Sequence, residues 1–165
     1  MNKSAFILIV LIVISSICQS QNKRPNVLLL ISDQHSGRIM TQTGYPLKTP
    51  GIDKLADEGV TFTRSYCTYP VCVASRASIM TGMMPSKSNE NLTSYPSIGK
   101  LMKDAGYETA YFGKWHVSNS KMNKVEDWHG FTTYKDERDD SKTEEMSIDF
   151  LNKKHDNPFF LVTSY

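Results

Sequence analysis

Residues 26–31 have the sequence NVLLLI and are followed at once by the polar run SDQH at residues 32–35. A short, continuous apolar run of this kind predicts a strand that is buried on both faces, as in a parallel sheet covered by helices. Open α/β sheets place ligands at the carboxyl ends of their strands. We therefore expect an α/β fold in which Asp33 and Gln34 occupy the first candidate site position.

Strand and helix patterns alternate along the rest of the chain. Thr49 and Pro50 begin a predicted short helix that ends at Gly59, and residues 60–66 have the composition of another strand. The later expected elements are a helix over residues 76–81, an amphipathic helix over 97–105, a strand over 107–112, a polar loop over 118–142, a helix with a capping box at Ser141 and Glu144, and a last strand over 158–165. This alternation predicts a mainly parallel sheet flanked by helices.

The composition of the chain is that of one globular domain. Of its 165 residues, 39% are hydrophobic and 22% are charged, and the formal net charge is only +2. Lysine and arginine are scattered among aspartate and glutamate, so no concentrated positive field would attract a polyanion. We expect neither a nucleic acid nor an anionic membrane surface as a partner.

The first twenty residues have the three parts of an export signal. Lys3 precedes an apolar run over residues 5–14, and small or polar residues follow up to Ser20. We expect cleavage near Ser20, which leaves residues 21–165 as an exported, periplasmic or extracellular chain. One alternative is a membrane span, but the apolar run is shorter than the ~20 residues that a span needs. Another is a lipoprotein anchor at Cys18, although the bulky Ile17 precedes that cysteine.

The most specific segment is CVASRASIMTG at residues 72–82. It resembles the signature of the formylglycine-dependent sulfatases, which has a cysteine, a small residue or proline two positions later, Ser-Arg, and a closing Thr-Gly. The resemblance implies that Cys72 is oxidised to formylglycine, whose hydrated form attacks sulfur and later releases sulfate, while Arg76 holds the diol in one orientation. Ala74 stands where many members have proline, which bears on the maturation enzyme that accepts the segment.

A disulfide is the competing interpretation of Cys72. Cys67 lies close by in sequence, and two cysteines in an exported chain commonly pair. The signature around Cys72 favours a free thiol or formylglycine instead. We therefore predict that Cys72 is not bonded to Cys67.

The segment RPNVLLLISDQ at residues 24–34 looks like the opening strand of the same family, which ends in metal-binding residues. The resemblance implies that Asp33, Gln34 and the converted Cys72 bind a divalent cation. Carboxylate and amide oxygens suit a hard ion, Ca²⁺ or alternatively Mg²⁺. Many members have two consecutive aspartates here, so Gln34 should weaken the site. Taken alone, an Asp-Gln pair after a strand is also common in a plain turn.

The segment GYETAYFGKWH at residues 106–116 is similar to the second signature of the family. The resemblance implies that Lys114 binds a sulfate oxygen and that His116 is a titratable partner of a diol hydroxyl. Alternation along an extended segment would place both side chains on one side.

Together the three signatures imply an alkaline-phosphatase-like fold, truncated relative to the family, and a sulfuric ester hydrolase whose catalytic residues are Cys72, Arg76, Lys114 and His116. The implied partners are a sulfated small molecule or carbohydrate and a formylglycine-generating maturation enzyme. The alternatives are a phosphonate or phosphate monoester hydrolase of the same superfamily and a non-catalytic truncated product. We expect no turnover by these 165 residues alone, partly because the strand at 158–165 would leave an uncovered hydrophobic sheet edge.

Overall fold

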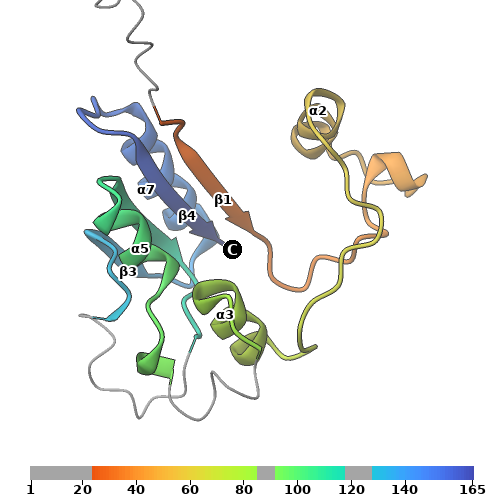
Figure 1. Ribbon diagram of the computed structural model, residues 1–165. Coiled ribbons are helices and arrows are strands. Elements are labelled where there is room, and N and C mark those ends of the chain that lie inside the picture. The colour runs from red at the N-terminus through yellow and green to blue at the C-terminus, as the bar shows by residue number, and fades with distance from the viewer. Residues whose placement is uncertain (1–23, 85–91, 118–127) are drawn as a thin grey trace, which may run out of the picture.

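The computed structural model describes residues 24–84, 92–117 and 128–165, and the predicted export signal lies outside these residues. Four strands form one sheet in which every pair is parallel, with the order β1-β4-β2-β3 (Figure 1). The strands are β1 Val27–Ile31, β2 Glu108–Gly113, β3 Thr133–Asp136 and β4 Phe159–Ser164. The predicted parallel α/β sheet is confirmed.

Helices cover both faces of the sheet (Figure 1). α3 (Cys72–Thr81) and α5 (Ile98–Asp104) lie on one face, and α7 (Asp140–Asn152) lies on the other. The described residues also include α2 (Pro50–Glu58) and the short 3-10 turns η1 (Thr41–Thr43) and η2 (Leu92–Ser94). Figure 1 shows α2 and η1 held away from the sheet. Among the residues that the structure describes, no helix is both long and apolar enough to cross a membrane.

The alternation of side chains along β4 divides the core into two clusters. Phe160 and Val162 face α3 and α5, where they join Met80 and Tyr111 in the larger cluster. Phe159 and Leu161 face α7 and join the smaller cluster. Because successive side chains of a strand point to opposite faces, the apolar run of β4 fills both layers at once.

The order of the strands corrects two expectations. β4 is not an edge strand, because it lies between β1 and β2 and all six of its residues are buried. β1 is an edge strand, and its two faces are not equally covered: Leu28 is 45% exposed and Leu30 is 53% exposed. The reason is that α7 packs on β2 and β4 and leaves this face of β1 open. Among the described residues, the exposed hydrophobic edge of the sheet therefore lies on β1.

Two further expectations about the secondary structure are wrong. Residues 60–66 form no strand; they are irregular, and Phe62 is 80% exposed, because no strand of the sheet pairs with them. The predicted polar loop at 118–142 contains β3 and the start of α7. The N-cap of α7 is Asp139, whose carboxylate accepts hydrogen bonds from the backbone N–H groups of Ser141 and Lys142, and not Ser141 itself.

Glu108, Lys153 and His155 form a charged cluster at the amino end of β2, at the opposite end of the strand from the candidate site. The carboxylate of Glu108 accepts a hydrogen bond from Lys153 Nζ and lies 2.7 Å from His155 Nδ1. Burial opposes ionisation of Glu108, but the bonds to Lys153 and His155 outweigh it, and the pKa of this carboxyl is lowered from its ordinary value of 4.5. A carboxyl with a lowered pKa stabilises the fold above its unfolded pKa and loses that contribution as the pH falls.

Replacing Glu108 should therefore cost stability at neutral pH and not in acid. We expect Glu108→Gln to lower the free energy of unfolding by about 1 kcal/mol at pH 7, with the difference from wild type vanishing as the pH falls below 4.5. Urea unfolding of both proteins between pH 3 and pH 7 measures this. Glu145→Gln, an exposed change on α7, is the control. A difference that persists unchanged into acid would contradict the assignment.

Candidate active site

The register of the sheet brings the carboxyl ends of three strands together. Ser164 at the end of β4 pairs with Ile31 of β1 on one side and with Gly113 of β2 on the other. Just beyond the strands, the Asp33 N–H donates to Tyr165 O at 2.9 Å, and the Lys114 N–H donates to Ser164 O at 2.9 Å. The residues after β1 and β2 therefore flank the end of β4, which is where parallel α/β sheets place ligands.

Asp33 and Lys114 form an ion pair across this edge. Lys114 Nζ donates to Asp33 Oδ2, and Arg76 Nη2 lies 4.0 Å from Asp33 Oδ1. The hydrogen bond from Lys114 is the largest cause of a lowered Asp33 pKa; burial opposes it, and the positive charges of Lys114 and Arg76 add to it. Asp33 is consequently a carboxylate at neutral pH.

Cys72 and His116 form the second pair of the site. α3 begins at Cys72. The residue before it, Val71, makes no side-chain hydrogen bond to the backbone N–H groups of the first turn. Cys72 Sγ lies 3.3 Å from His116 Nδ1. Burial first, and then the positive charges of Lys114 and Arg138, lower the pKa of His116, so its imidazole is neutral at pH 7 and can accept a proton. Cys67 and Cys72 are both free thiols in this structure.

Arg76 joins helix α3 to the ends of two strands. Its side chain is only 4% exposed, and Nη1 donates to Lys114 O and to Ser164 Oγ, both at 2.7 Å. The Tyr111 hydroxyl donates to the same carbonyl at 2.6 Å. Arg76 therefore fixes the backbone of Lys114 as well as contributing charge. Neither Ser164 nor Tyr111 was predicted as a site residue, although the polar residue that ends the apolar run of β4 was a signal that could have pointed to Ser164.

The segment after β2 is a turn and not an extended chain, so the expected alternation does not explain how Lys114 and His116 meet. Gly113 has a φ of 100° and His116 a φ of 42°. Lys114 reaches Asp33, while His116 reaches Cys72. The structure thus brings Cys72, Arg76, Lys114, His116 and Asp33 into one site by a different local conformation.

The donor atoms at the end of β1 suit a hard cation. Asp33 offers carboxylate oxygens and the exposed Gln34 offers an amide oxygen, whereas Ca²⁺ takes six to eight oxygen ligands. The described residues contain no group of three or more His, Cys, Asp or Glu residues arranged to hold a metal ion. Asp33 and Gln34 alone offer too few oxygen atoms for such a shell, and in this structure the Asp33 carboxylate is paired with the Lys114 ammonium.

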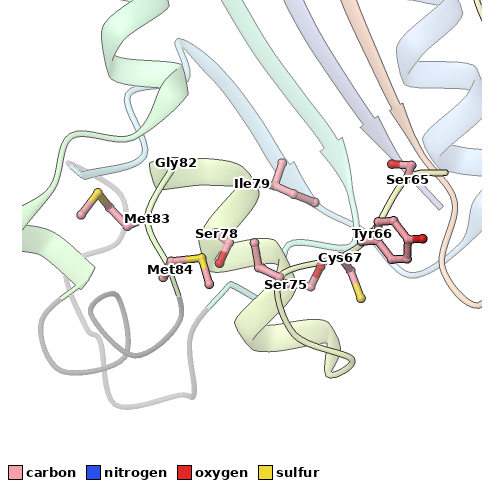
Figure 2. A pocket seen from close by; sticks show the side chains of 10 residues that line it. Ser65, Tyr66, Cys67, Ser75, Ser78, Ile79, Gly82, Met83 and Met84 are labelled. Atoms are coloured by element: carbon pink, nitrogen blue, oxygen red, sulfur yellow. The ribbon is translucent and has the colours of Figure 1, made fainter. Parts of the chain in front are cut away.

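A groove of about 460 Å³ lies beside α3 and does not include the site residues (Figure 2). Ser75, Ser78 and Ile79 of α3 line it, facing the segment that contains Tyr66 and Cys67 (Figure 2). Ser78 Oγ is buried with no hydrogen-bond partner among the described residues. The groove carries no charged side chain, in contrast to the cluster around Asp33 and Cys72, which is where the reactive groups gather.

The chain is similar in sequence and in structure to known sulfatases. The family model described as Sulfatase matches residues 25–165. The chain is 39% identical over 102 residues to the uncharacterized sulfatase YidJ of Escherichia coli (strain K12). The aligned residues make up 58% of this chain and 20% of that protein. It is similar to the structure of BT4656 in complex with its substrate D-glucosamine-2-N,6-O-disulfate, with a TM-score of 0.67, 25% identity, and coverage of 86% of this chain and 34% of that one.

The same fold occurs in the phosphonate monoester hydrolase of Agrobacterium radiobacter, with a TM-score of 0.64 and 19% identity over 86% of this chain and 40% of that one. The parallel α/β sheet and its likeness to the BT4656 structure show that the chain has the alkaline-phosphatase-like fold. The chain belongs to the sulfatase family, whose model covers nearly all of the described residues. It spans about a fifth of the length of the curated relatives it matches.

Proposed function

We propose that this chain supplies the nucleophile and the anion-binding side chains of a sulfuric ester hydrolase. The observation that carries the proposal is the convergence of Cys72, His116 and Lys114 at the amino end of α3. Cys72 Sγ lies 3.3 Å from an imidazole that is neutral at pH 7, and Lys114 stands on the neighbouring turn. Free backbone N–H groups and the positive end of a helix dipole at the same point favour an anionic substrate.

Conversion of Cys72 to formylglycine would supply a hydrated aldehyde. One of its hydroxyls attacks sulfur and displaces the alcohol of the ester, and its other hydroxyl loses a proton as the aldehyde re-forms and sulfate is released. His116, held against this position, accepts a proton from the hydroxyl. Lys114 exchanges its bond to Asp33 for a sulfate oxygen and neutralises the charge that shifts in the transition state. Arg76, which is buried and bonded to Lys114 O and Ser164 Oγ, orients these groups and adds a positive charge behind them.

Asp33, Gln34 and the converted Cys72 are the proposed ligands of the divalent cation, Ca²⁺ or alternatively Mg²⁺. All three would offer oxygen, which these ions prefer. A bound cation supplies positive charge for the sulfate group. In this structure the Lys114 ammonium is paired with the Asp33 carboxylate. A cation bound to Asp33 would replace Lys114 there, and the Lys114 ammonium could then bind the sulfate group.

The proposed substrate class is a sulfated carbohydrate or small molecule, which is supported by the similarity to BT4656 in complex with a disulfated glucosamine. The proposed protein partner is a formylglycine-generating maturation enzyme. Residues 1–20 are proposed to direct export, with cleavage near Ser20. Residues 21–165 would then form the N-terminal part of a catalytic domain.

A phosphonate monoester hydrolase is the second candidate function, and the fold shared with the Agrobacterium radiobacter enzyme supports it. A converted Cys72, Lys114 and a hard cation would also bind a phosphonate. The sulfatase signature at residues 72–82 and the match to the sulfatase family favour the sulfate ester. The ratio of aryl sulfate to aryl phosphonate turnover separates the two.

The state of Cys72 tests the proposal directly. We expect mass spectrometry of protein isolated from its native host to find a Cys72 peptide that has lost sulfur and gained an aldehyde. Cys67 lies on the same tryptic peptide, residues 65–76, and is the internal control that should retain its thiol. A peptide in which Cys67 is disulfide-bonded to Cys72 would refute the proposal.

A further inference from the structure

Asp136 reaches from the end of β3 to the turn that follows β2. The Trp115 N–H donates to Asp136 Oδ1 at 3.0 Å, and Arg138 Nε lies 3.4 Å from the same oxygen. β3 is the neighbour of β2 in the sheet, and Gly113 pairs with Asp136, so the carboxylate starts beside the turn that it contacts. Asp136 belongs to none of the three sulfatase-like segments.

Trp115 lies between Lys114 and His116 and is held at two points. Its indole is 6% exposed and packs edge-on against Tyr111, with ring centroids 5.0 Å apart, and against Tyr134 at 5.6 Å. Its backbone N–H is held by Asp136. With both the ring and the amide fixed, the directions in which the two neighbouring side chains leave the backbone are fixed as well.

The turn needs such support because its conformation is unfavourable in isolation. His116 has a φ of 42°, in the left-handed region that residues other than glycine rarely adopt. The hydrogen bond to Asp136 lies one residue before this strained position. Without an acceptor for the Trp115 N–H, the turn can relax toward a common conformation, and the His116 ring would leave its place 3.3 Å from Cys72 Sγ.

We propose that Asp136 is a positioning residue of the site: by accepting the Trp115 N–H, its Oδ1 keeps Lys114 directed at Asp33 and His116 directed at Cys72. Asp136 itself contacts neither Cys72 nor Asp33 and acts through the backbone of Trp115. Its effect on turnover rests on the proposed sulfatase function, whereas its effect on the turn does not.

Two substitutions separate the acceptor from the charge. Asp136→Ala removes the acceptor, and Asp136→Asn keeps a carbonyl oxygen of the same reach while removing the negative charge. In the complete catalytic domain, of which residues 21–165 would form the N-terminal part, matured with a formylglycine-generating enzyme, we expect Asp136→Ala to lower kcat for an aryl sulfate about 10- to 100-fold, the size of effect that a misplaced catalytic group produces. Asp136→Asn should stay within a few-fold of wild type. Lys135→Ala, an exposed neighbour on β3, is the matched control and should leave kcat unchanged.

A second readout does not depend on turnover. In ¹⁵N-labelled protein, the Trp115 amide should be protected from hydrogen exchange in wild type and in Asp136→Asn, and should lose that protection in Asp136→Ala while the amides of β4 keep theirs. If the complete matured domain turns over no aryl sulfate, the proposed function fails, and the exchange comparison still decides the role of Asp136. Unchanged Trp115 protection in Asp136→Ala, or an Asn variant as impaired as the Ala variant, overturns the proposal. Should Asp136→Ala not fold, Asp136→Asn decides alone, since it must keep both wild-type turnover and wild-type protection.

Discussion

In the complete catalytic domain, matured with a formylglycine-generating enzyme, Cys72→Ala is expected to abolish aryl sulfate turnover, with a loss of at least about 10⁴-fold in kcat, because no other group can take over from a removed nucleophile. Cys72 lies at the first residue of α3 with His116 Nδ1 at 3.3 Å from its sulfur. An alanine there leaves the sulfate-binding charges in place but gives the substrate nothing to react with. Steady-state kinetics on an aryl sulfate, with parallel assays on an aryl phosphonate, measure the effect.

Cys67→Ala is the matched control, because Cys67 is exposed and free and lies only a few residues before the site. It should keep wild-type kcat and wild-type maturation of Cys72. Turnover that survives in Cys72→Ala would show that the nucleophile has been assigned to the wrong residue. A substantial loss in Cys67→Ala would instead restore the disulfide interpretation.

Where the signal is local, the sequence allowed the positions of the candidate site residues in the fold to be predicted. Asp33 and Lys114 lie within two residues of the end of a strand, and a parallel sheet brings such positions to one edge. Cys72 begins a helix that the Thr-Gly ending of its motif closes at Gly82. In each case a short stretch of chain contains both the reactive residue and the element that places it, so the pattern of neighbouring residues was sufficient.

Contacts between distant segments could not be predicted in the same way. Arg76 and Ser164 are far apart in the chain and meet only because β4 inserts between β1 and β2. Nothing in the apolar pattern of residues 26–31 or 158–165 reveals which strand lies at the edge. β1 was therefore predicted to be covered on both faces and β4 to be the uncovered edge, whereas the structure has the opposite arrangement. The strand predicted at 60–66 failed for a related reason: its composition favours a strand, but the sheet offers it no neighbour.

Gly113→Ala, which adds one methyl group at the end of β2, is expected to destabilise the fold strongly. A Cβ on Gly113 would lie 1.9 Å from the backbone oxygen of Ser164 and 2.9 Å from Thr143 Cγ2. The φ of 100° is also one that a side chain disfavours. The clash is with the backbone of a central strand, which cannot move aside without breaking the β2–β4 pairing. We expect a loss of more than about 4 kcal/mol in the free energy of unfolding, measured by urea denaturation.

Gly82→Ala separates the two causes, because Gly82 has a similar left-handed φ of 68° but open space where its Cβ would be. It should cost only the conformational term, about 1–2 kcal/mol. The difference between the two variants is then the contribution of the close approach between Gly113 and Ser164. Because the two backbones lie this close, the Lys114 N–H can donate a hydrogen bond to Ser164 O. The same contact sets the distance between the ends of β2 and β4, on which the site depends. Equal losses in both variants would show that β2 and β4 can separate freely, and that the site does not need this contact.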